Sequence, residues 1–225
     1  MHIVTIVFLL QLAFLTGTAL LFMYHGGSIV HEIGGQDARE YMLLGEQLLD
    51  SGEFRLPDKG VPETWRTPGY PFFVAVNFAL TNHSLTLLLV VLALVGALTS
   101  GLMYLIGLEL SLSPRAAFAA GLLFGVSPAV IWIPPSAMGG DILFIFLLTA
   151  ALFILVRLIR IERWYFATIG LGLLLGAATL VRPLGLYLSL ILIASTPFFL
   201  PHTDLRKKML CVLIAIVGFA LITTP

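Results

Sequence analysis

The chain has 225 residues, of which 59% are hydrophobic and only 11% are charged. Its mean hydropathy is +1.04. Because about a quarter of the residues of a soluble domain are charged, this composition excludes a soluble protein and indicates an integral membrane protein. The formal net charge is zero, which provides neither a basic surface for nucleic acid nor a polybasic tail for lipid.

Seven apolar stretches have about the length that a helix needs to cross a bilayer, roughly 20 residues. They cover residues 3–24, 85–108, 116–133, 140–158, 164–181, 184–200 and 209–224. An uncharged start and no clear small-residue cleavage site predict that the first stretch is a retained span, not a removed signal peptide. Residues 70–80 are apolar but too few to span, and we expect them to dip into the interface or re-enter the bundle.

The basic residues in the short connections indicate the orientation. One set of connections carries Arg115, Arg157, Arg160, Arg163, Arg206, Lys207 and Lys208. The other set carries only Arg182 in its short connections, beside the long loop 25–71. This bias predicts a multi-pass protein of the cytoplasmic (inner) membrane, with its N-terminus inside and the long loop outside.

The long loop is the main hydrophilic passage of the chain. Eight of the twelve acidic residues lie between Glu32 and Glu63. Apolar residues recur within 41–49 at helical spacing, which predicts an amphipathic helix on the membrane surface. Asp37 lies at its N-terminal end and Gly52 follows its C-terminal end. Residues 65–71, WRTPGYP, predict a turn that leads back into the membrane.

Four charged residues are predicted to gather on the external face. Asp37 and Arg66 belong to the loop, Asp141 opens the fourth span, and Arg182 closes the fifth. Each also has a structural explanation: a helix cap for the two aspartates, a bond to loop carbonyls for Arg66, and snorkelling to the head groups for Arg182. Four other loop residues are interpreted as solvated: His31, Glu32, Glu40 and Glu63.

Several motifs together resemble the N-terminal half of the membrane-embedded GT-C glycosyltransferases. They are D-x-x-x-Y at 37–41, R-x-P-x-Y-P at 66–71, an acidic residue opening a later span at Asp141, and G-x-x-x-G-x-x-x-L-x-R-P at 172–183. The chain resembles the branch with protein O-mannosyltransferases and the lipid A aminoarabinose transferase. The resemblance implies one GT-C-like domain over 1–225. Because such enzymes commonly continue further, we expect the N-terminal part of a longer architecture.

The resemblance also implies a reaction and its residues. The donor would be a polyprenyl-phosphate-linked sugar, and the acceptor a lipid, glycan or protein at the external, periplasmic face. Asp37 would be the general base of an inverting transfer, with Arg66 and Arg182 binding the donor phosphate. Asp141 would assist the acceptor or a metal ion. A divalent metal ion is a candidate cofactor, without a ligand cluster in the sequence that decides it.

Two other functional classes stay open from the sequence. A transporter or lipid-carrier flippase subunit would place polar features at the middle of the membrane, whereas Asp141 and Arg182 are predicted at its edge. An inactive fragment is the other alternative. A retinal protein is disfavoured because the stretch 209–224 contains no lysine.

Overall fold

The computed structural model describes residues 2–24, 35–57, 61–132, 140–160, 164–200 and 203–224. Within these ranges the regular structure is helical, and one isolated β-bridge joins Arg55 and Pro62. The helices are α1 (His2–Tyr24), α3 (Gly35–Ser51), α4 (Gly69–Thr81), α5 (Leu85–Glu109), α6 (Pro114–Gly125), α7 (Pro128–Trp132), α8 (Gly140–Arg157), α9 (Trp164–Val181), α10 (Leu184–Ser195), the 3-10 helix η1 (Thr196–Phe199) and α11 (Leu205–Thr223). The all-α prediction is confirmed.

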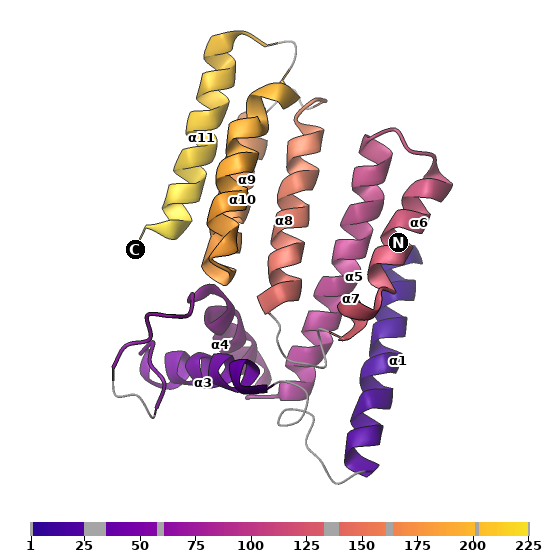
Figure 1. Ribbon diagram of the computed structural model, residues 1–225, viewed down its shortest axis with the longest axis vertical. Helices are drawn as coiled ribbons and strands as arrows, with labels where there is room; N and C mark the ends of the chain where they lie inside the picture. Colours follow the sequence, from indigo (N-terminus) through magenta and orange to yellow (C-terminus); the bar gives the residue numbers. More distant parts are fainter. Residues whose placement is uncertain are drawn as a thin grey trace.

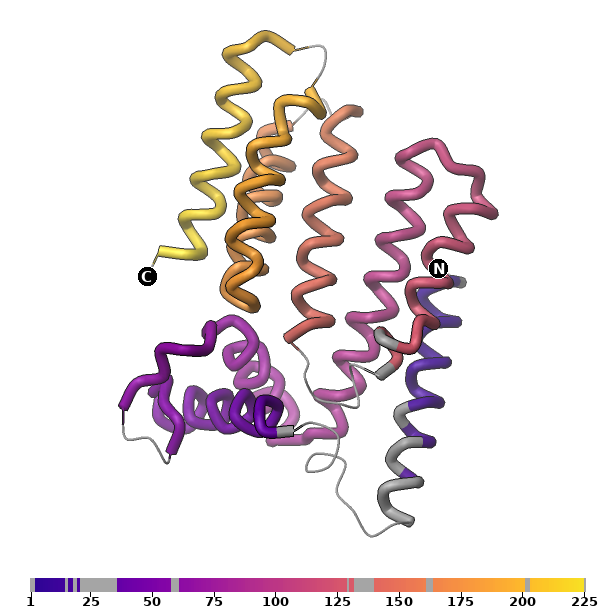
Figure 2. Tube along the Cα trace, viewed as in Figure 1, coloured from indigo at the N-terminus to yellow at the C-terminus, as the bar shows by residue number. Residues whose placement is uncertain are grey.

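An upright bundle and a layer across its end make up the molecule (Figure 1). The helices α1, α5, α6, α8, α9, α10 and α11 run alongside one another. α3 lies below the lower ends of α9 and α10, with α4 beside it, while α5 and α1 extend down beside this layer. Figure 2 traces the same path: α1 runs down, and after α3 and α4 the chain returns upward through α5. We call α3, α4 and the loop between them the end layer.

Among the described residues, three helices are long and apolar enough to cross a membrane: α5, α8 and α9. Shorter apolar helical segments accompany them: Ile3–Phe14, Gly69–Thr81 and Leu184–Phe199. These helices fit a multi-pass membrane protein. The number of seven spans and the external position of the loop go beyond this finding and stay predictions.

The stretch 116–133 is not one continuous helix, as the sequence predicted, but two. α6 ends at Gly125 and α7 begins at Pro128. Pro128 lacks a backbone N–H and restricts the conformation of the residue before it, so a proline favours the start of a new helix. The Ser127 hydroxyl accepts a hydrogen bond from the N–H of Val130 at 3.4 Å, as expected of an N-cap.

The predicted amphipathic helix is α3, and its predicted ends are confirmed. Asp37 lies in its first turn, and Gly52 follows it with a φ of 70°, a conformation that favours glycine. The buried face packs against α4, where a Cβ at Gly45 would lie 2.6 Å from the side chain of Val74. Since α4 also contacts α5 and α9, it connects the end layer to the bundle.

The helices α9 and α11 pack with their backbones in contact. A Cβ at Gly172 would overlap with the carbonyl oxygen of Ala215, and one at Gly218 would lie 2.6 Å from the carbonyl oxygen of Ile169. Gly176, about one turn further along α9, also faces the α11 backbone. The glycines of the G-x-x-x-G motif therefore let the two helices approach closely, as small residues do in membrane helix pairs.

Substitution of Gly172 by Ala is expected to destabilise the protein by about 1–3 kcal/mol, because the added methyl group forces two backbones apart. Thermal unfolding of the detergent-solubilised protein measures this as a lower Tm. Gly170→Ala is the matched control, because a Cβ there would meet its nearest atom, on Ile154, at an ordinary 3.7 Å. Equal Tm values for the two variants would contradict the close packing.

Candidate active site

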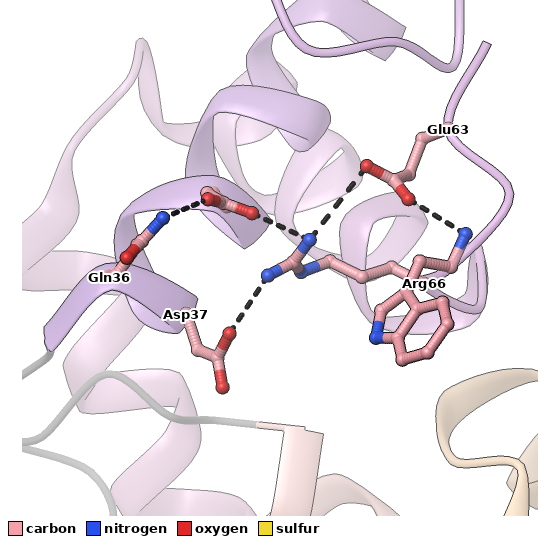
Figure 3. A network of polar contacts seen from close by, with 6 residues as sticks. Gln36, Asp37, Glu63 and Arg66 are labelled. Carbon is pink, nitrogen blue, oxygen red and sulfur yellow. Dashed lines mark hydrogen bonds and ion pairs between the residues drawn. The ribbon is translucent and has the colours of Figure 1, made fainter. Parts of the chain in front are cut away.

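Arg66 lies between three carboxylates in the end layer (Figure 3). Its Nη2 donates a hydrogen bond to Oδ1 of Asp37 at 2.8 Å, and its Nη1 lies 2.6 Å from Oε2 of Glu40 and 3.8 Å from Oε2 of Glu63. Asp37 and Glu40 are three residues apart on α3 and therefore share a face. We call these four residues the Arg66 cluster; they join the start of α3 to the loop before α4.

The members of the Arg66 cluster differ in their access to solvent. The side chains of Arg66, Glu40 and Glu63 are 12%, 13% and 5% exposed, whereas that of Asp37 is 72% exposed. When all four are ionised, three negative charges face one positive charge. Asp37 is therefore the carboxylate of this cluster that an incoming molecule can reach.

The surroundings raise the pKa of the Arg66 guanidinium. Burial alone would lower this pKa, but the hydrogen bond to Asp37 and the charges of Glu40, Asp37 and Glu63 act in the opposite direction and outweigh it. The guanidinium also lies 5.6 Å from the centre of the Tyr41 ring, within the range of a cation–π interaction. Arg66 is thus a permanently charged group that holds the neighbouring carboxylates in place.

The interpretation of Glu40 and Glu63 as solvated residues is wrong. Both side chains are largely buried against Arg66, because a buried guanidinium draws carboxylates around it. The sequence spacing did contain a signal for these contacts. Glu40 follows Asp37 by three residues, and Glu63 precedes Arg66 by three. The other two residues given the same interpretation, His31 and Glu32, lie outside the described residues.

A second ion pair joins the ends of two bundle helices. Oδ1 of Asp141, in the first turn of α8, lies 2.8 Å from Nη2 of Arg182, which directly follows α9. The two side chains are 43% and 31% exposed. The Nε of Arg182 is buried and has no hydrogen-bond partner among the described residues. A Cβ at Gly140 would lie 3.4 Å from that Nε, so the glycine leaves room for the guanidinium.

The two ion pairs are joined by a direct contact between their neighbours in the chain. The hydroxyl of Thr67 donates to the carbonyl oxygen of Val181 at 3.0 Å. Thr67 follows Arg66, and Val181 precedes Arg182. The structure therefore brings Asp37 and Arg66 together, brings Asp141 and Arg182 together, and connects the two pairs at the same end of the bundle. Thr67 is a residue that the sequence did not single out.

No group of three His, Cys, Asp or Glu side chains in the described ranges is arranged to hold a metal ion. The proposed metal-assisting role of Asp141 stays a prediction.

The arrangement offers an accessible carboxylate held by one guanidinium and a second, partly exposed guanidinium nearby. The carboxylate can accept a proton, and the second guanidinium can bind an anion.

Comparisons with known proteins assign the family. No curated protein and no solved structure gives a match. The profile of the family described as dolichyl-phosphate-mannose-protein mannosyltransferase matches residues 65–225, most of the chain. The matched part includes Arg66, Asp141 and Arg182, while Asp37 and Glu40 precede it. With its apolar helices and this match, the chain belongs to the dolichyl-phosphate-mannose-protein mannosyltransferase family of membrane glycosyltransferases.

Proposed function

We propose that the protein transfers a sugar from a polyprenyl-phosphate donor to a lipid, glycan or protein acceptor at the external face of the membrane. The observation that carries this proposal is the pairing of Asp37 with Arg66 and of Asp141 with Arg182 at one end of the bundle. Family membership supports the reaction class. The end of a membrane bundle is also where a lipid-borne donor and a water-borne acceptor can meet.

In this proposal Asp37 is the general base of an inverting transfer. An acceptor hydroxyl oxygen forms the new bond to the anomeric carbon while the bond from that carbon to the phosphate oxygen breaks. The hydroxyl proton passes to the Asp37 carboxylate, and the electron pair of the broken bond leaves with the polyprenyl phosphate. Asp37 keeps Arg66 on Oδ1, so Oδ2 is the oxygen that we assign to the proton.

Arg182 is assigned to the departing phosphate. Its guanidinium is partly exposed, its charge faces Asp141, and its Nε has no partner among the described residues. The exposed part of the guanidinium can donate to a phosphate oxygen, while the buried Nε cannot be reached from outside. Arg66 was predicted from the sequence to bind the same phosphate, but three carboxylates now surround it. Phosphate binding by Arg66 would require the displacement of at least one of them, so we assign it mainly to holding Asp37.

The assignment of the external face is supported by the distribution of basic residues. Arg115, Arg157 and Arg206 lie in the end turns of α6, α8 and α11, away from the end layer (Figure 1). Basic residues are concentrated on the cytoplasmic side of membrane proteins. In the proposal, the Arg66 cluster therefore lies on the opposite, external side of the membrane.

The experiment that tests the function uses the full chain in lipid vesicles with dolichyl phosphate mannose as the donor probe. Arg182→Gln is expected to raise the donor KM about tenfold or more, because a hydrogen bond to a charged group contributes about 1.5–3 kcal/mol. Arg115→Gln, at the other end of the bundle, is the matched control. Movement of the intact donor across the vesicle without sugar transfer would instead support the transporter alternative.

A further inference from the structure

The hydroxyl of Thr67 caps the C-terminal end of α9. Val181 is the last residue of α9, and the last carbonyls of a helix have no partner within it. The Thr67 hydroxyl donates to the Val181 carbonyl at 3.0 Å across 114 residues of sequence. The Val181 residue is 3% exposed, so water does not readily replace this bond. A side chain of the end layer therefore supplies the hydrogen bond that the last carbonyl of α9 lacks within its own helix.

A steric contact beside this hydrogen bond fixes the same two segments. A Cβ at Gly69 would lie 2.6 Å from the carbonyl carbon and oxygen of Leu180. The backbone before α4 therefore lies directly against the backbone at the end of α9. Together, the Thr67 bond and the Gly69 contact leave little freedom for these segments to slide past each other.

The Thr67–Val181 bond lies one residue away from each half of the candidate site. Consecutive Cα atoms are about 3.8 Å apart, so a shift of Thr67 moves Arg66, and a shift of Val181 moves Arg182. We propose that Thr67 is a positioning residue that sets the distance between Asp37 and the donor phosphate held by Arg182. This inference rests on the proposed function, since it assigns the base to one half and the phosphate to the other.

Aromatic contacts support the same connection. Tyr70 is fully buried, and its ring meets the Tyr41 ring edge-on at 5.4 Å between centroids. Tyr41 lies under the guanidinium of Arg66. On the other side, a Cβ at Gly140 would lie 3.7 Å from the Tyr70 ring and 3.4 Å from Nε of Arg182. The Tyr70 ring therefore contacts the surroundings of both Arg66 and Arg182.

The first test compares Thr67→Val with Thr67→Ser in the full chain in vesicles, with dolichyl phosphate mannose as the donor. Valine keeps the shape of threonine but removes the hydroxyl. Because small displacements of reacting groups lower the rate of the chemical step strongly, we expect kcat to fall at least about tenfold. The donor KM should stay within about twofold, because the pair of Arg182 with Asp141 does not involve Thr67. Serine retains the hydroxyl and should restore kcat to within about threefold of the parent.

A matched control is Thr149→Val, which removes a hydroxyl that donates to the carbonyl of Ile145 within α8, at 2.7 Å. This variant should keep the parent kcat. A kcat for Thr67→Val equal to that of the control would overturn the inference. A kcat that Thr67→Ser fails to restore would overturn it as well.

The second test does not depend on activity. Spin labels at Trp65 and Phe166, which are 87% and 66% exposed, would report the distance between the end layer and the far end of α9. That helix has 18 residues, which corresponds to about 27 Å and is measurable by pulsed electron resonance. Thr67→Val should broaden the distance distribution, and Thr67→Ser should narrow it again. An unchanged distribution in Thr67→Val would refute the positioning role, whatever the outcome for the Asp37 base.

Discussion

Asp37→Asn is expected to lower kcat for sugar transfer by about 10²–10⁴-fold, the usual contribution of a general base. Asparagine has nearly the same shape and can still accept a hydrogen bond from Arg66, but it cannot take the acceptor proton. Glu40 and Glu63 continue to neutralise Arg66, so the fold of the end layer should survive. The measurement is transfer from dolichyl phosphate mannose by the vesicle-reconstituted full chain.

The matched control for this prediction is Asp50→Asn, at the other end of α3. It removes one carboxylate from the same helix and should leave kcat within about twofold of the parent. Membrane insertion and Tm should be the same for both variants. Near-normal transfer by Asp37→Asn would exclude Asp37 as the base, while leaving the family assignment untouched.

The second large effect is expected for Arg66→Met, and it is an effect on stability. Methionine fills part of the space of the arginine side chain but leaves Glu40 and Glu63 as largely buried carboxylates without their cation. Removal of one partner from a buried ion pair costs about 3–5 kcal/mol. We expect faster hydrogen exchange of α3 and a lower Tm.

A compensating variant distinguishes the charge effect from a packing effect. Adding Glu40→Gln and Glu63→Gln to Arg66→Met removes the two buried negative charges and should recover part of the lost stability. Asp37 should need no such change, because its side chain is mostly exposed. Unchanged hydrogen exchange in the Arg66→Met protein would show that the cluster does not hold the end layer.

Features that depend on neighbouring residues were predictable from the sequence. The limits of α3 follow from its apolar spacing and from Gly52, and the position of Arg182 at the end of α9 follows from Pro183. These signals are local, because a helix period and a helix-breaking residue act within a few positions of the chain.

Features that depend on contacts between distant segments were not predictable in the same way. The burial of Glu63 depends on where Arg66 meets α3, and the Thr67–Val181 bond joins residues 114 apart. The break at Pro128 is a different case. Its signal is local, but the apolar composition of 116–133 outweighed it, because hydropathy measures solubility in the membrane and not backbone continuity.

The close contact between α9 and α11 has a consequence for how the protein tolerates variation. Gly172 is ten residues before Arg182, about 15 Å along a stiff helix. A side chain that displaces α9 from α11 would tilt the far end of that helix, where Arg182 and the carbonyl bound by Thr67 lie. Inherited changes deep inside the bundle can therefore reduce sugar transfer without altering any group that touches a sugar. The packing of the interior thus contributes to the geometry at the end of the bundle as well as to stability.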